Sequence, residues 1–169
     1  MAQSTSSIRH GLTSKHWSKL AHLNLKYRHA LLDQRSLTLR AYDYCKIHQG
    51  AFFLNVTTQE WQTMSRFEAT HLKAKDNRSA LIRQVAFGCN QHTLITARSV
   101  IPKHTWQINR LLFKKLGDQS LGQLLFKHAF SYRQTMWFSR PGAAPPARLS
   151  LFYLNDAPLL VEETFFYPL

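Results

Sequence analysis

Two pairs of strand-like segments dominate the second half of this chain. Residues 80–88 and 93–101 are rich in β-branched and apolar side chains, and a four-residue link separates them. Residues 148–154 and 158–166 repeat the pattern across a three-residue link. Links this short join antiparallel neighbours. Consecutive hairpins therefore predict one antiparallel sheet.

Helical spacing of apolar residues occurs before the predicted sheet and in its middle. The helices expected are 14–34 with Ser14 as its cap, 37–48 after Ser36, 105–116 and 121–126. Residues 51–58 and 128–138 have strand character. The fold class expected is α+β, a single antiparallel sheet with helices packed on one face.

The length of 169 residues fits one domain, and residues 1–12 are expected to form a loose tail. A chain of this size buries enough surface to fold without a metal or disulfide staple. It contains no apolar run long enough to span a membrane, and its polar start lacks the features of a secretory signal. Cys45 and Cys89 are the only cysteines, which indicates two buried free thiols in a cytoplasmic protein.

The formal net charge of +13 is the strongest bias in the composition. It suits a nucleic-acid-binding protein, because neutralised phosphates drive such binding. It also suits a protein that attracts an anionic metabolite or an acidic membrane surface. The densest cluster, Lys15 to His29, is typical of a solvated helix face. Because the chain has no DNA-reading motif, we do not expect a nucleic-acid partner.

Several catalytic signatures are missing from the sequence. It has no Gly-rich phosphate loop, no dinucleotide fingerprint and no Gly-x-Ser-x-Gly elbow. It also has neither His-Glu-x-x-His nor Cys-x-x-Cys among its nine His and two Cys. Hydrolytic and metal-dependent chemistry therefore lack support.

Charged residues inside the strand-like segments are the remaining candidates for a site. They are Arg83, Arg98, Arg148 and Glu163. One reading places them on the solvent face of a half-exposed sheet. The other points them into a pocket, where an Arg offers its fork to a carboxylate and a Glu accepts a proton or a hydroxyl hydrogen bond.

Several short fragments are informative through their order. They are Arg83-Gln84-Val85, Ala97 to Pro102, Leu116-Gly117, Leu121-Gly122, Leu125-Phe126, and Pro158 to Glu163 with Phe165. Together they resemble the chorismate lyase family, the chorismate–pyruvate lyases that make 4-hydroxybenzoate and pyruvate at the first step of bacterial ubiquinone biosynthesis. The agreement runs from Ser36 to the C-terminus, roughly four-fifths of the chain. Each fragment is weak alone, but the ordered set is specific.

The resemblance implies a sheet of about six strands, with helices forming flaps over an enclosed ligand cavity. It implies no cofactor and no metal, and we expect a cytoplasmic monomer. Arg83 would bind the ring carboxylate and Glu163 the ring-hydroxyl end, while Leu37 and Leu121 would line the cavity. Arg98 or Arg148 would steady the leaving enolpyruvate or structure the pocket.

The chain departs from the family pattern at two places that affect the shape of the pocket. Thr93-Leu94 stands where members often have Pro-Trp, and Ser120 stands where they usually have Pro. Glu162 beside Glu163 leaves a choice, because successive strand residues face opposite sides. The spacing from Pro158 and to Phe165 favours Glu163 as the inward carboxylate.

Two other classes of protein compete with the lyase: a ligand sensor and a nucleic-acid-binding protein. By resemblance, the same fold serves as the effector-binding domain of bacterial transcription regulators, which carry a separate DNA-binding domain before it. Residues 1–35 are too short for such a domain. Chorismate turnover identifies an enzyme, ligand binding without turnover identifies a sensor, and salt-dependent DNA binding identifies a nucleic-acid-binding protein. The basic surface would at most touch a membrane transiently.

Overall fold

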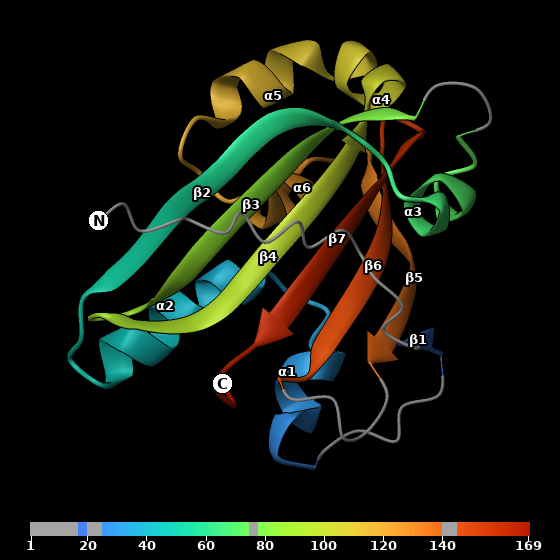
Figure 1. Ribbon diagram of the computed structural model, residues 1–169. Coiled ribbons are helices and arrows are strands. Elements are labelled where there is room, and N and C mark those ends of the chain that lie inside the picture. The colour runs from blue at the N-terminus through green and yellow to red at the C-terminus, as the bar shows by residue number, and fades with distance from the viewer. Residues whose placement is uncertain (1–16, 20–24, 75–77, 140–144) are drawn as a thin grey trace, which may run out of the picture.

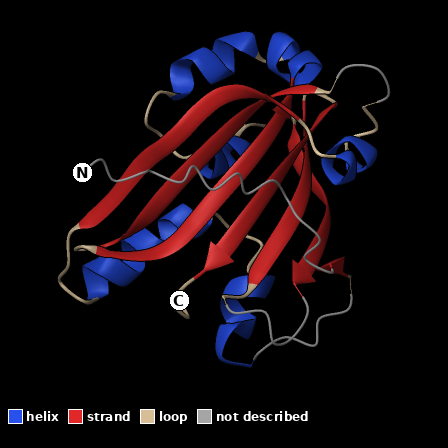
Figure 2. Cartoon of the chain, viewed as in Figure 1, coloured by secondary structure: helices blue, strands red, loops and turns tan. Residues whose placement is uncertain are grey.

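The computed structural model describes residues 17–19, 25–74, 78–139 and 145–169. Figure 1 shows one twisted sheet with helices packed around it, and Figure 2 shows the same view coloured by secondary structure. The expected tail at residues 1–12 and the expected cap Ser14 lie outside the described residues.

Within the described residues, seven antiparallel strands form a single sheet in the order β1-β5-β6-β7-β4-β3-β2. The strands are β1 (Trp17–Ser18), β2 (Phe52–Thr63), β3 (Ser79–Cys89), β4 (His92–Pro102), β5 (Ser131–Ser139), β6 (Ala147–Leu154) and β7 (Ala157–Phe165). The sequence predicts six of these strands, and the addition is the two-residue β1 at the edge beside β5. The predicted α+β class with one antiparallel sheet is confirmed.

The helices precede the sheet and interrupt it, as the apolar spacing predicts. They are α1 (Arg28–Leu32), which follows a 3-10 turn (η1, Leu25–Tyr27), α2 (Leu37–Ile47), α3 (Arg66–His71), α4 (Lys103–Ile108), α5 (Arg110–Leu116) and α6 (Leu121–Lys127). α2 and α6 occupy the two segments expected at 37–48 and 121–126. α3 was not predicted.

The prediction of one continuous helix at residues 14–34 is wrong. Trp17 and Ser18 are extended and pair with the end of β5, and the next described helical residue is Leu25. The Trp17 side chain, which is partly buried, packs against a core cluster on the sheet. Helical spacing is a weak preference, and tertiary packing of a large aromatic side chain overrides it.

The predicted helix at 105–116 is two helices that meet at Asn109. The Asn109 side chain is buried and donates to the main-chain oxygens of Thr105, at 3.0 Å, and Leu154, at 3.1 Å. Its own oxygen accepts from Asn155 at 2.7 Å. These bonds fix the junction of α4 and α5 to the turn between β6 and β7.

A β-bulge sets the register between β3 and β4. The pairing shifts by one residue between Phe87 and Gly88, so that Arg83 lies opposite Ser99. Glycine is required at the bulge, because a Cβ on Gly88 would lie 2.0 Å from the main-chain oxygen of His92. A shift of one residue exchanges the two faces of a strand. The bulge therefore decides which side chains of β4 share a face with Arg83.

The two faces of the sheet carry separate cores. On the helix-covered face, Val85, Phe87 and neighbouring apolar residues pack against α2, and a second cluster packs against α5 and α6. On the opposite face, here the α3 face, Ile82 and Val100 belong to a cluster that includes Ala69 of α3. The candidate site lies on the helix-covered face.

Both cysteines belong to the core beside α2 and are buried free thiols, as the sequence predicts. Burial, together with the neighbouring Cys89 thiol, raises the pKa of Cys45 to about 12. Its Sγ donates to the main-chain oxygen of Gly88 at 3.4 Å. The two thiols pack α2 onto β3, and the raised pKa makes Cys45 a poor nucleophile.

Candidate active site

A cavity lies between the helix-covered face of the sheet and helices α2 and α6. Its volume is about 20 Å³, which is room for one or two water molecules. A ring-sized ligand therefore enters only when lining side chains move outward. The sheet contributes Arg83, Val85, Phe87, Ala97, Ser99, Phe152, Val161 and Glu163, and the helical side contributes Leu37, Thr38, Ser120, Leu121, Gly122, Leu125 and Phe126.

Arg83 lines the cavity from β3 and is 2% exposed. Its Nη1 donates to Oε1 of Gln59 on β2. Its Nη2 donates to the main-chain oxygens of Gly117 and Gln119, each at 2.8 Å. Gly117 has a φ of 49°, which lets the chain turn sharply after α5. All three acceptors are neutral, so the described residues offer this guanidinium no carboxylate at hydrogen-bonding distance.

The surroundings of Arg83 favour an anionic ligand. Burial lowers the pKa of Arg83, and the negative charge of Asp118 opposes this only in part. The Arg83 Nε is buried and has no acceptor among the described residues. A buried donor without an acceptor costs free energy. A ligand carboxylate at this point would satisfy both the donor and the charge.

Glu163 lines the same cavity from β7. Its side chain is 11% exposed, and its Oε2 accepts a hydrogen bond from Nε of Arg148 at 2.5 Å. The neighbouring Glu162 lies opposite Arg98 in the register and faces the other side of the sheet. The structure therefore places Glu163, and not Glu162, at the cavity.

Arg148 on β6 is fully buried and holds the Glu163 carboxylate through its Nε. Its Nη1 donates to three main-chain oxygens at the end of α1: those of Ala30, at 3.4 Å, Leu31, at 3.2 Å, and Asp33, at 2.6 Å. Arg148 is not a lining residue itself. It contacts the cavity through the Glu163 carboxylate.

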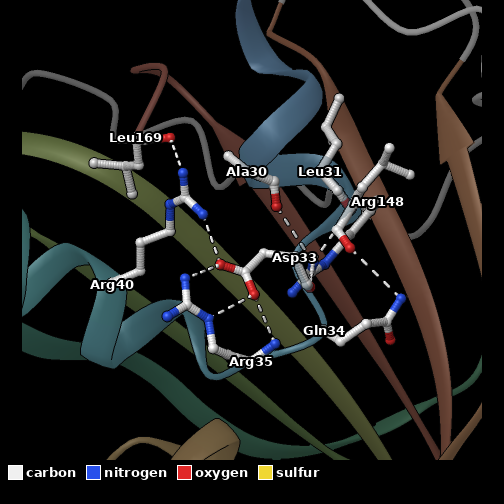
Figure 3. Close-up of polar contacts among 9 residues, drawn as sticks. Ala30, Leu31, Asp33, Gln34, Arg35, Arg40, Arg148 and Leu169 are labelled. Carbon is white, nitrogen blue, oxygen red and sulfur yellow. Dashed lines mark hydrogen bonds and ion pairs between the residues drawn. The ribbon is translucent and has the colours of Figure 1, made fainter.

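The Asp33 side chain extends this network to α2 (Figure 3). Its carboxylate accepts from Nη2 of Arg35 at 2.9 Å and from Nη1 of Arg40 at 2.6 Å. Arg40 in turn donates to the main-chain oxygen of Leu169 at 2.5 Å. Burial alone would raise the pKa of Asp33, but the hydrogen bonds from Arg35 and Arg40 hold it well below its usual range. The network ties α1, α2 and Leu169 in the segment after β7 together beside the site.

Leu37 and Leu121 stand at the first positions of α2 and α6, and both line the cavity. The two helices are joined beside them by a buried hydrogen bond between the hydroxyls of Thr38 and Ser120, at 2.6 Å. The roof of the cavity is therefore a pair of connected helix starts.

Arg98 does not line the cavity, because the bulge at Gly88 turns it to the α3 face. There its Nη1 forms an ion pair with Oε1 of Glu68, which is 1% exposed. The other carboxylate oxygen of Glu68 accepts from the main-chain N–H of Ser65 at 2.7 Å and so caps α3. Arg98 is thus committed to holding α3 on the sheet.

Sequence reasoning missed Gln59, which holds Nη1 of Arg83. Gln59 lies just beyond position 58, where the predicted strand ends. The prediction stops there because the polar residues that follow lack apolar alternation. The structure continues β2 to Thr63. It also missed the polar pair Thr38 and Ser120, whose contact spans 82 residues of sequence.

The described ranges, residues 17–19, 25–74, 78–139 and 145–169, bear on metal binding and on membrane spans. No group of three or more His, Cys, Asp or Glu side chains in these ranges is placed to hold a metal ion. None of the helices in this part of the chain is long and apolar enough to cross a membrane.

Comparison with known proteins agrees with the sequence resemblance. A family model described as "Chorismate lyase" matches residues 12–169. A "Probable chorismate pyruvate-lyase" from Methylococcus capsulatus is 33% identical over 156 residues, covering 82% of this chain and 92% of that protein. A protein with the same name from Aromatoleum aromaticum is 29% identical over 154 residues, covering 80% of this chain and 81% of that protein.

The fold also matches a solved structure. The effector domain of PhnF from Mycobacterium smegmatis superposes with a TM-score of 0.50 at 13% sequence identity, over 79% of this chain and 90% of that domain. At this level of identity the likeness concerns the fold alone.

Proposed function

This chain belongs to the chorismate lyase family, and we propose that it cleaves chorismate into 4-hydroxybenzoate and pyruvate in the cavity beneath α2 and α6. As in the family that the sequence resembles, this would be the first step of ubiquinone biosynthesis in a bacterial cytoplasm. The proposal uses neither a metal nor a cofactor.

The observation that carries the proposal is the buried Arg83. Its guanidinium lines an enclosed cavity, keeps Nε unpaired and has only neutral oxygens as hydrogen-bond partners among the described residues. A planar carboxylate fits such a fork in a bidentate or two-point contact. We assign this position to the ring carboxylate of chorismate.

Glu163 supports the other end of the ring. Arg148 occupies its Oε2, and a carboxylate oxygen retains further acceptor capacity for the ring hydroxyl. We assign Glu163 to this hydroxyl and to the removal of the ring hydrogen on the same carbon. Leu37 and Leu121 would pack on the ring.

The reaction conserves its atoms. The bond between the ring carbon and the enolpyruvyl oxygen breaks, and its electrons leave with that oxygen. The ring C–H is lost and its electrons complete the aromatic ring, while a proton is delivered to the CH₂ carbon of the departing enolpyruvate to give pyruvate. Aromatisation supplies the driving force. The protein's task is to hold the reactive conformer and to stabilise charge in a site that excludes water.

The experiment mixes the purified protein with chorismate and follows pyruvate by a coupled dehydrogenase assay and 4-hydroxybenzoate by chromatography. Both products should appear in equal amounts. Arg83→Gln should lower kcat/KM by about 100-fold or more, because it removes a charge-assisted pair with the substrate. Arg110→Gln, an exposed arginine on α5, is the matched control and should keep full activity.

Two outcomes would contradict the proposal. If the wild type binds chorismate without forming products, the domain acts as a ligand sensor of the same fold. If Arg83→Gln turns over chorismate normally, the role assigned to Arg83 is wrong even though the enzyme is a lyase.

A further inference from the structure

Arg133 on β5 is another arginine beside the cavity, and it is partly buried. Its Cζ lies 4.8 Å from the centre of the Phe152 ring and 5.2 Å from the centre of the Phe126 ring. Both rings line the cavity. The guanidinium therefore lies against two rings of the cavity wall, in the arrangement that cation–π contacts favour, although Arg133 is not itself a lining residue.

The hydrogen bonds of Arg133 are incomplete. Its Nη1 donates to Oε1 of Gln34 at 3.1 Å. Its Nε and Nη2 are buried, and neither has an acceptor among the described residues. A guanidinium offers five N–H donors and pays for each one that is buried unmet. A stacked position on two rings does not explain these donors, but an anion beside the rings would.

The charges at this end of the cavity also lack a balancing anion. Arg133 and Arg148 are close enough to interact unfavourably, and Glu163, which also attracts Arg133, already accepts a hydrogen bond from Arg148. Asp33 also attracts Arg133, but Arg35 and Arg40 already neutralise it. Burial, together with Arg148, lowers the pKa of Arg133 to about 10, so the side chain stays charged at neutral pH.

The two ends of the cavity are therefore alike. Arg83 on β3 has no carboxylate partner at hydrogen-bonding distance among the described residues, while Arg133 on β5, four strands away, and Arg148 on β6 share one carboxylate. The cavity and the residues directly around it therefore carry an excess of two positive charges, one on Arg83 and one on the pair Arg133 and Arg148. This pattern is complementary to a small dicarboxylate that lies across the sheet.

We propose that Arg133 binds the second carboxylate of the substrate, which in chorismate is the enolpyruvyl carboxylate. The inference rests on the function proposed above. Arg133 suits the role better than Arg148, which already makes bonds to Glu163 and to three main-chain oxygens. It also suits the role better than Arg98, which lies on the α3 face. Phe126, which is 39% exposed, is the ring that would move to open the path.

The product provides a selective test, because 4-hydroxybenzoate lacks the second carboxylate. Arg133→Met should lower kcat/KM for chorismate by about 10- to 100-fold, the value of one charge-assisted pair. The dissociation constant for 4-hydroxybenzoate, measured by calorimetry, should change by less than about twofold. Arg83→Gln should weaken both. Arg133→Lys, which keeps the charge without the fork, should give an intermediate loss.

Arg110→Met is the matched control, because Arg110 is an exposed arginine on α5. It should leave both ligands unaffected. Unchanged turnover by Arg133→Met would overturn the inference, and so would equal losses of chorismate turnover and 4-hydroxybenzoate affinity. These results differ from failure of the proposed function, in which the wild type itself releases no pyruvate from chorismate and the inference falls with it.

Discussion

At the scale of single residues, the buried pair of Arg148 and Glu163 is the contact on which the site depends most. Arg148→Met would leave the Glu163 carboxylate buried without its cation. Breaking one side of a buried ion pair costs about 3–5 kcal/mol, and we expect the free energy of unfolding, measured by urea denaturation, to fall by that amount. Turnover of chorismate should fall as well, because Glu163 loses the bond that orients it.

A double variant separates charge from packing. Arg148→Met combined with Glu163→Leu removes both charges, so its free energy of unfolding should exceed that of Arg148→Met alone. Arg110→Met on the surface should stay within about 0.5 kcal/mol of the wild type. Equal stability of the single and double variants would show that the lost pair is not the cause.

The residue scale also shows the limit of prediction from sequence. Arg83 and Glu163 were singled out because charge interrupts strand patterns and because their fragments match a family. The same argument placed Arg98 in the pocket. A hairpin closed without a bulge would put Arg98 opposite Arg83 on the same face. The bulge at Gly88 moves the register by one residue, and nothing in the alternation of apolar residues reveals it.

At the scale of elements, the hydrogen bond between Thr38 and Ser120 joins the two helices that roof the cavity. Ser120→Ala would leave the Thr38 hydroxyl buried and unpaired and would loosen α6 from α2. A neutral buried hydrogen bond contributes about 1 kcal/mol, so 4-hydroxybenzoate should dissociate about fivefold faster. Stopped-flow displacement measures this rate.

Thr70→Ala on α3 is the control for that variant, because it removes an exposed hydroxyl bond on the opposite face. Its product dissociation rate should equal that of the wild type. A Ser120→Ala protein that releases product at the wild-type rate would exclude α2 and α6 as the moving roof.

Elements were predictable where local pattern and tertiary environment agree. The strands at 80–88 and 93–101 are interior strands of the sheet, with a neighbour on each side, and their apolar runs are longer than any turn would tolerate. α3 escaped prediction because its capping box, Ser65 with Glu68, precedes only a short segment. The prediction of a long helix at 14–34 is wrong for the opposite reason. The helical spacing is regular, but it carries no information about the strand that pairs with Trp17.

At the scale of the whole molecule, the net charge of +13 works against stability, because like charges repel in the compact state. The chain has few carboxylates, and three of them form ion pairs that offset part of this repulsion. Glu68, Glu163 and Asp33 each pair with an arginine that is buried or partly buried. Arg83 in the cavity and Arg133 beside it carry part of the same surplus of positive charge, and under the function proposed above they would attract a dianion.

Acidification should therefore destabilise the protein through two separable effects. The pKa of Asp33 is held below its usual range in the folded state, so its contribution to stability is full above about pH 4 and is lost as pH falls below that value. Protonation also raises the net positive charge and its repulsion. We expect the free energy of unfolding to fall between about pH 4 and pH 2. Adding 0.5 M NaCl should restore only the part due to general repulsion, because salt screens exposed charges far better than buried ones.

Asp33→Asn should lower the free energy of unfolding by about 1–3 kcal/mol at pH 7. It should also flatten the salt-insensitive dependence of that free energy on pH, whereas Asp43→Asn, which changes an exposed carboxylate on α2, should leave this dependence unchanged. If salt restores the whole loss in the wild type, the Asp33 network contributes nothing to acid stability, and repulsion among the surface cations alone sets the pH limit of the fold.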